Sequence, residues 1–187
     1  MQSSVDDKQL IARAQRGDKK AISTLYTTHL QSIYKYVRYR VDTDAQAEDI
    51  TSDVFLRMVR ELPRYQVTGA PFRAWLYRIA YNCIVDIYRR PVTDGLTDEI
   101  SENLPGDTDD PFQVLALAED HDQLRRALSS LSPDYQNVLV LRFINDVPHA
   151  EVAEIMGKSE ANARVLQHRA LKALANALEI IQQGGLL

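Results

Sequence analysis

One face of the segment 71–90 carries side chains that together could bind a strand of nucleic acid. In a helix that turns about 100° per residue, five side chains fall within an arc of about 80°: Trp75, Arg78, Asn82, Asp86 and Arg89. Guanidinium groups can clamp phosphates, amides can bond base edges, and an aromatic ring can stack on an unpaired base. The competing interpretation is structural. In it Trp75 belongs to the core, and Asp86 forms surface ion pairs with Arg78 or Arg89 that contribute little to stability.

The other face of this segment is apolar and is expected to pack in a core. It carries Leu76, Ile79, Ala80, Cys83 and Ile87. Cys83 is the only cysteine of the chain, so no internal disulfide can form. We therefore predict that Cys83 is a small buried residue and not a redox switch.

Residues 148–171 have the pattern of two short helices joined by a tight turn. Pro148 suits the start of the first helix, Gly157 the left-handed residue that ends it, and Ser159 the cap of the second. The second helix carries the basic side chains Arg164, His168, Arg169 and Lys172. This is the plan of a helix-turn-helix, whose second helix enters the DNA major groove. An ordinary helical hairpin in a bundle would have the same residues at its helix boundaries.

Residues 47–59 predict a helix with an acidic surface. Glu48, Asp49 and Asp53 could pair with basic residues of a protein partner. The apolar side chains among them supply either contact area or core: Ile50, Val54 and Phe55. The alternative is a solvated acidic face. A metal site is not expected, because no second set of ligands accompanies these carboxylates and the four histidines are scattered.

Composition limits the remaining classes. The chain has 187 residues, 45% of them hydrophobic, which is enough for one packed domain or two small ones. No stretch approaches the roughly 20 apolar residues of a membrane span, and the first residues lack the apolar run of a secretory signal. We expect a cytoplasmic protein without a cofactor.

The net charge of −4 conceals a strong segregation. Residues 57–90 carry seven basic and two acidic side chains, whereas residues 91–122 carry ten acidic side chains and no lysine or arginine. The segment with the candidate nucleic-acid face is thus the most basic part of the chain. An acidic overall composition does not argue against DNA binding when charge is distributed in this way.

The acidic block also predicts the domain boundary, since it is rich in Pro, Gly, Ser and Asp and lacks apolar periodicity. We predict an all-α fold with two small helical domains, 1–91 and 121–187, joined by a flexible acidic linker over 92–120. The helices are expected at 7–15, 18–40, 44–62, 71–90, 111–130, 133–144, 148–156 and 160–182.

Four segments, in this order, resemble the extracytoplasmic-function (ECF) group of bacterial sigma factors, which are sigma-70-like. They are RAQRGDKKAISTLY (13–26), AEDITSDVFLRMV (47–59), FRAWLYRIAYNCIVDIYRR (72–90) and LSPDYQNVLVLRFINDVPHAEVAEIMGKSEANARVLQHRALKAL (131–174). The resemblance implies that the 47–59 helix docks on a coiled coil of the largest polymerase subunit through Glu48, Asp49, Ile50, Ser52 and Asp53. Ser52 stands where the family usually has Gln.

The resemblance also implies two DNA sites. The loop 63–71 and the helix after it would capture a flipped base of the melted promoter −10 element, with Arg64, Tyr65, Arg73, Trp75, Tyr77, Arg78, Asn82, Asp86, Arg89 and Arg90. The helix-turn-helix would read the −35 element as duplex, with Lys158, Asn162, Arg164, Gln167, His168 and Arg169. Leu166 and Gln167 depart from the usual basic-then-aliphatic pair, and Ala163 replaces a common Val. One interpretation is that Gln167 reads a base while Leu166 packs inward.

The function implied is that of an alternative sigma factor, which binds core RNA polymerase and directs promoter-specific transcription initiation without being an enzyme itself. The apolar helix 133–144 could be core or could also dock on the polymerase flap. An anti-sigma factor is an expected partner; a small-molecule substrate and direct membrane insertion are not expected. The alternative is a stand-alone helix-turn-helix regulator. An all-helical hydrolase using the 44–53 carboxylates lacks every other element of a site.

Overall fold

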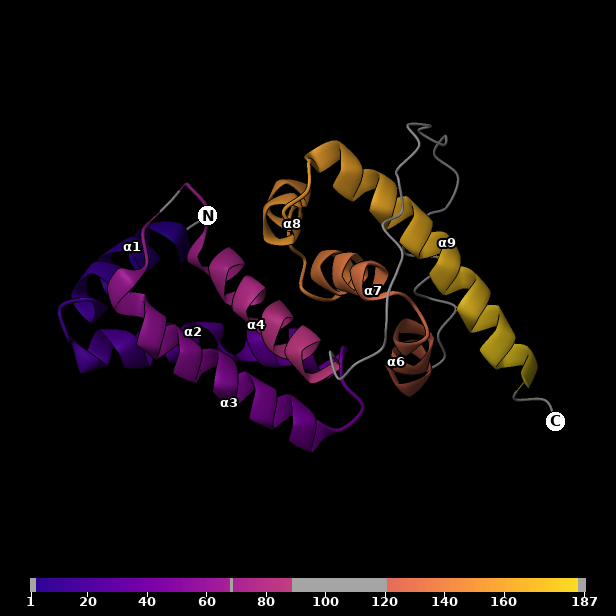
Figure 1. The fold of residues 1–187 in the computed structure, drawn as a ribbon, viewed down its shortest axis with the longest axis horizontal. Helices are drawn as coiled ribbons and strands as arrows, with labels where there is room; N and C mark the ends of the chain where they lie inside the picture. Colours follow the sequence, from indigo (N-terminus) through magenta and orange to yellow (C-terminus); the bar gives the residue numbers. More distant parts are fainter. Residues whose placement is uncertain (1–2, 68, 89–120, 185–187) are drawn as a thin grey trace.

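The structure consists of two groups of helices (Figure 1). This computed structural model describes residues 3–67, 69–88 and 121–184. Those residues form helices and connecting turns, and no strand occurs among them. The prediction of an all-α fold with two small helical domains is confirmed.

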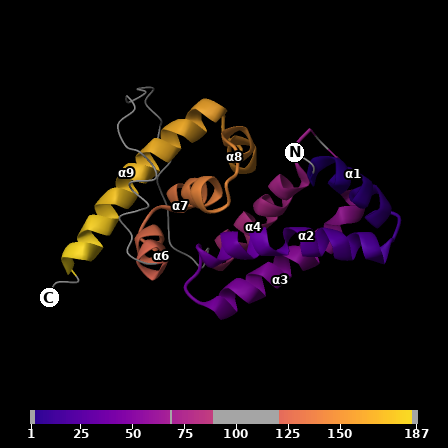
Figure 2. The ribbon, with the colours of Figure 1, turned by 180° about the vertical axis from the view of Figure 1, so that it is seen from behind.

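The N-terminal domain contains α1 (Ser3–Ala14), α2 (Lys19–Arg38), α3 (Asp44–Glu61) and α4 (Phe72–Tyr88). A short 3-10 turn, η1 (Leu62–Arg64), follows α3 directly. Helix α2 packs against α1, α3 and α4, and both views show these helices side by side (Figures 1 and 2). Their contact faces bury an aliphatic core: Leu25, Ile33, Val54, Met58, Leu76 and Ile84.

Side-chain caps determine where these helices begin. The Asp18 carboxylate accepts hydrogen bonds from the backbone N–H groups of Lys20 and Ala21 at the start of α2. These bonds and the Arg13 guanidinium, 2.7 Å away, lower the pKa of Asp18. Thr43 and Gln46 form a reciprocal capping box at the start of α3.

The C-terminal domain contains α6 (His121–Ser129), α7 (Pro133–Leu139), α8 (His149–Met156) and the long α9 (Glu160–Gly184). The Ser132 hydroxyl caps α7 by accepting a hydrogen bond from the Tyr135 N–H. Of the helix expected over 111–130, only the part belonging to α6 lies within the described residues. The expected linker 92–120 lies outside them.

The helix expected over 133–144 is not regular to its end. After α7 the chain winds into a π-helical turn, η2 (Val140–Ile144), in which the Asn145 N–H donates to the Val140 carbonyl. Asp146 then adopts a positive φ of 51°. Such turns widen a helix and redirect the chain, and they frequently occur at functional sites. Here the turn carries Asn145 toward the other domain.

The two domains pack against each other: α8 contacts α4, and η2 contacts α2. Buried polar bonds cross the interface. The Tyr36 hydroxyl donates to Asn137 at 2.6 Å, and the Asn145 amide donates to the Ser32 carbonyl at 2.7 Å and to the Tyr77 hydroxyl at 3.1 Å. The interface is therefore a specific one, because each of these groups finds a directional partner on the other domain.

In the described parts of the chain, we find no helix that combines the length and the apolar character needed to cross a bilayer.

Candidate nucleic-acid interface

An aromatic cluster lies where η1 meets the start of α4. The Tyr65 ring packs on Trp75 with 4.5 Å between centroids and 39° between the ring planes, and Phe72 contacts both rings at 5.4 and 5.3 Å. Phe72 is buried, whereas Tyr65 and Trp75 are half-buried and pack against the core only in part. Burial raises the pKa of the Tyr65 hydroxyl, so this group stays protonated and can donate a hydrogen bond. Trp75 is thus neither wholly core nor wholly surface.

These two rings form one wall of a cavity of about 490 Å³, which we call the aromatic–cationic cavity. Its lining residues are Arg60, Glu61, Arg64, Tyr65, Gln66, Ala70, Ala74, Trp75, Arg78 and Glu154. Three guanidinium groups and two aromatic rings on which a base could stack thus line the same cavity. Stacking on aromatic rings combined with positive charge is how proteins hold unpaired bases and their phosphates.

Helix α8 of the C-terminal domain reaches the cationic side of this site. Arg73 forms a two-pronged ion pair with Glu151, with N–O distances of 2.8 and 2.6 Å. This pairing raises the pKa of Arg73. Arg78 donates to the backbone carbonyl of Glu154 at 2.7 Å. Two of the arginines expected to bind the −10 strand therefore contact the other domain in this conformation.

The remaining residues expected at the −10 site are not all brought together. Asn82 is exposed on α4, as expected for a residue that reads a base. Asp86 is also exposed, and it pairs with Arg57 of α3 at 3.4 Å. Arg89 and Arg90 lie outside the described residues.

The expectation for Tyr77 is corrected. Tyr77 is only 1% exposed, its ring packs on Tyr36 with 5.3 Å between centroids, and its hydroxyl accepts from Asn145. Its position on α4 is covered by α2 and by the turn after η2, so in this conformation it is a core residue. Ile87, expected on the apolar face of α4, is 50% exposed, while Cys83 is buried as predicted.

The helix-turn-helix has the predicted geometry. Gly157 ends α8 in the left-handed region with φ of 64°, and the Ser159 hydroxyl accepts from the Asn162 N–H at 3.2 Å as α9 begins. Pro148 caps α8 from just outside it. Helices α8 and α9 pack on each other and on the rest of the domain.

The side chains expected to face −35 DNA differ in their exposure and in the bonds they already form within the domain. Arg164 is exposed and pairs with Glu160 one helical turn away, at 2.6 Å. Lys158 pairs with Asp134 at 3.1 Å. Gln167 accepts a hydrogen bond from Arg142 at 3.3 Å, so its amide oxygen is engaged within the domain. The rest are half-buried: Asn162, His168 and Arg169. Leu166 packs against the core, as the sequence suggested.

Helix α3 presents the acidic surface expected to bind a protein partner. Glu48, Asp49, Ser52 and Asp53 are all exposed. Ile50 is a correction, since it is 3% exposed and belongs to the core of the N-terminal domain. The described residues contain no group of three side chains placed to hold a metal ion.

Some surface residues were missed from the sequence. Leu56 and Val59 extend the α3 surface and are 54% and 44% exposed, although the neighbouring Val54 and Phe55 are buried. Helical spacing from Ser52 could have identified them. No sequence signal could have placed Glu154 at the aromatic–cationic cavity, because its position depends on packing between the domains.

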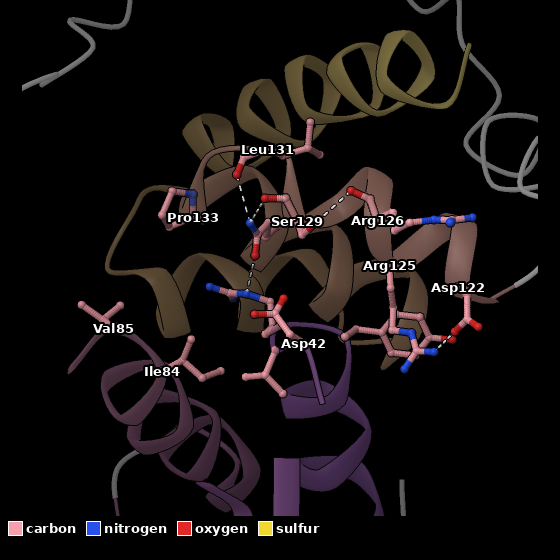
Figure 3. Close-up of a pocket in the computed structure, with 13 residues that line it drawn as sticks. Asp42, Ile84, Val85, Asp122, Arg125, Arg126, Ser129, Leu131 and Pro133 are labelled. Atoms are coloured by element: carbon pink, nitrogen blue, oxygen red, sulfur yellow. Dashed lines mark hydrogen bonds and ion pairs between the residues drawn. The ribbon is translucent and has the colours of Figure 1, made fainter. Parts of the chain in front are cut away.

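A second cavity, of about 680 Å³, lies between the domains near the C-terminal part of α4 (Figure 3). Ile84 and Val85 line it from the N-terminal domain, and Leu131 and Pro133 line it from the C-terminal one. Its described lining includes none of the residues expected to bind DNA and none of the α3 residues expected to bind polymerase. It is therefore separate from the candidate interface.

Comparison with known proteins agrees with this arrangement. Residues 25–91 match the family model of sigma-70 region 2, and residues 121–174 match that of sigma-70 region 4. The ECF RNA polymerase sigma factor SigD of Mycobacterium tuberculosis is 30% identical over 181 residues, which cover 94% of this chain and 84% of SigD. This chain belongs to the ECF family of RNA polymerase sigma factors.

Other relatives of this sigma factor match over most of its length. The ECF RNA polymerase sigma factor BldN of Streptomyces coelicolor is 36% identical over 175 residues, which cover 91% of this chain but only 65% of BldN. The structure of CnrH in complex with the cytosolic domain of CnrY has a TM-score of 0.71 at 23% identity and covers 94% of this chain and 98% of CnrH. This second likeness supports the fold.

The region 2 match of this sigma factor includes α3 and nine of the ten residues that line the aromatic–cationic cavity. The region 4 match includes the helix-turn-helix and supplies the tenth, Glu154. The two candidate DNA surfaces therefore belong to separate family regions that meet in this structure.

Proposed function

We propose that this sigma factor binds core RNA polymerase and directs promoter-specific transcription initiation, reading the −35 element as duplex and the −10 element as a melted strand. The observation that carries the proposal is the aromatic–cationic cavity, whose two rings and three guanidinium groups all belong to the N-terminal domain, whereas the helix-turn-helix belongs to the C-terminal one. A duplex reader needs no stacking site. A protein that holds strands apart needs one.

The energetics favour base capture at this cavity. Unstacking a base costs a few kcal/mol per step, and stacking on an aromatic side chain returns about 1–3 kcal/mol per base. Tyr65 and Trp75 supply the rings, while Arg60 and Arg64 supply charge for the adjacent phosphates. Asn82, exposed further along α4, is placed to bond a base edge.

The exposed surface of α3 is the proposed polymerase contact. Glu48, Asp49 and Asp53 carry the charge that steers a basic partner, and Leu56 with Val59 adds apolar area that water otherwise covers. The family resemblance supports a coiled coil of the largest subunit as the proposed partner surface.

The helix-turn-helix is the proposed −35 reader. The exposed Arg164 is the candidate for base contact, and Lys158 and Arg169 are candidates for phosphate contacts. The Arg142 bond limits Gln167 to its amide N–H groups as donors. Val138, Leu139 and Leu141 are buried, so a flap contact from this segment would involve the half-buried Phe143 and Ile144.

The protein contributes recognition and strand separation, while the polymerase performs the chemistry. Transcription is a cytoplasmic process in bacteria, so that is where the protein acts. Control by an anti-sigma factor is part of the proposal, because one partner lying across both domains could cover α3 and the helix-turn-helix together. Its test is a pull-down from the native cell while transcription by this factor is silent. Recovery of polymerase subunits alone would argue against an anti-sigma factor.

The decisive test combines the purified protein with core RNA polymerase on a library of promoter fragments. A sigma factor yields transcripts from defined start sites that are absent with core enzyme alone. A stand-alone regulator instead binds duplex DNA without polymerase and yields no new transcripts, and that result would refute the proposal.

A further inference from the structure

Gln15, in the turn that follows α1, spans the two ends of η1. Its amide nitrogen donates to the Leu62 carbonyl at 3.0 Å and to the Tyr65 carbonyl at 2.7 Å. Both hydrogens of one amide are thus used, on carbonyls 47 and 50 residues away in the chain. Gln15 also lies outside the residues that match either sigma-70 region.

The turn held by Gln15 needs external support. η1 has three residues, and Pro63 within it has no N–H to donate. Short 3-10 segments have poor hydrogen-bond geometry of their own. The Tyr65 N–H donates to the Leu62 carbonyl at 3.1 Å, and the Gln15 amide adds the two further bonds that link Leu62 to Tyr65.

The same turn determines where the wall of the aromatic–cationic cavity stands. Arg64 is its last residue and Tyr65 follows directly, and both line the cavity. A shift of the Tyr65 backbone would separate its ring from Trp75, because the centroids are only 4.5 Å apart. The α1 segment supports the cluster at a second point, where buried Asp7 contacts buried His29 at 3.3 Å and the His29 ring lies 5.5 Å from Phe72.

We infer that Gln15 is a positioning residue for base capture: it fixes the η1 turn so that Tyr65 and Trp75 present a preformed stacking surface to the unpaired base. This inference rests on the proposed function. Gln15 itself touches no DNA. It acts by holding Tyr65 in place before DNA binds, so that less conformational entropy is lost when the base stacks on the ring.

Trp75 makes the inference measurable, since it is the only tryptophan of the chain. Gln15→Met keeps the length of the side chain but removes both donors. We expect its Trp75 fluorescence to shift in wavelength and to become more accessible to acrylamide. Affinity of the holoenzyme for a forked −10 template should fall roughly tenfold, which corresponds to about 1.4 kcal/mol and to two ordinary hydrogen bonds.

Three controls separate positioning from simple stability. Gln9→Met, at an exposed position of α1, should leave fluorescence and fork binding unchanged. Gln15→Lys retains N–H donors at the tip and should restore most of the fork affinity. Binding of Gln15→Met to core polymerase and to −35 duplex should equal that of the wild type, with a melting temperature within a few degrees of it.

Two results would overturn the inference. One is native Trp75 fluorescence and native fork binding in Gln15→Met. The other is a uniform loss of all activities together with a large drop in melting temperature, which would make Gln15 a purely structural residue. Failure of the proposed function looks different: the wild-type holoenzyme itself would not bind the fork, while the fluorescence of the free protein would still report whether Gln15 holds the ring.

Discussion

At the scale of single residues, the candidate DNA contacts are already engaged in weak bonds that DNA could replace. Arg164 is the clearest case. Its ion pair with Glu160 joins two side chains that are each about half exposed, at 55% and 48%. Such exposed pairs contribute little to stability. Exchange of Glu160 for a guanine edge would therefore cost the protein almost nothing.

Replacing Arg164 with Ala should weaken binding to −35 duplex. If the guanidinium bonds a guanine, the loss is expected to be about 1–3 kcal/mol and to concern one base position. Competition binding with a set of −35 sequences measures this. Lys172→Ala, exposed further along α9, is the matched control and should have a small, sequence-independent effect. An equally uniform loss for Arg164→Ala would reduce Arg164 to a phosphate contact.

At the scale of elements, helix ends and the central turn of the helix-turn-helix could be predicted, since both depend on local chemistry. Gly157, Ser132 and Thr43 act through their own backbone or nearest neighbours. The π turn η2 and the burial of Tyr77 could not be predicted. Helix α4 packs against α2 and α3 of its own domain and, over part of its length, against α8, and periodicity cannot show which positions a distant segment covers.

The turn between α8 and α9 gives a stability prediction. Gly157 has φ of 64°, and a Cβ added there would meet no atom within 4 Å. Gly157→Ala should therefore cost about 1–2 kcal/mol from backbone strain alone. Gly69→Ala, which has equal space and no positive φ, is the control and should be nearly neutral. Equal melting temperatures for the two variants would mean that the turn does not require a left-handed residue.

Helix α3 gives a prediction about polymerase binding. Asp49→Arg reverses a charge on the proposed contact surface without touching the core, since Asp49 is exposed. Co-elution with core polymerase should fall severalfold, while helical content by circular dichroism stays unchanged. Glu179→Arg, exposed on α9, makes the same charge change elsewhere and should have no effect. Unchanged co-elution of Asp49→Arg would remove this surface from the polymerase interface.

At the scale of the whole molecule, the domains contact each other through the residues proposed to bind the −10 strand. Arg73 and Arg78 bond Glu151 and Glu154 of α8. Arg78 lines the aromatic–cationic cavity, and Arg73 belongs with it to the proposed −10 site, so a bound single strand would compete with α8 for both guanidinium groups. We therefore expect binding of the −10 element at the proposed site to move α8 away from α4.

Weakening the contact should favour the separated arrangement. Arg73 is 40% exposed in its side chain, so solvent screens the pair and Glu151→Gln should cost the closed state about 1 kcal/mol. Small-angle scattering of the free protein should then show a larger radius of gyration, and its affinity for single-stranded −10 DNA should rise severalfold. Glu179→Gln is the control. Identical scattering curves would show that Glu151 does not hold the domains together.

The most direct test of the central claim is permanganate reactivity of −10 thymines in complexes of promoter DNA with the holoenzyme. Wild-type protein should render them reactive, and Trp75→Ala should abolish this while retaining core and −35 duplex binding, because loss of base stacking costs about 1–3 kcal/mol. Trp75→Phe keeps a ring and should restore most of the reactivity at a similar melting temperature. Full reactivity with Trp75→Ala would contradict the account, since strand separation would then not depend on the aromatic–cationic cavity.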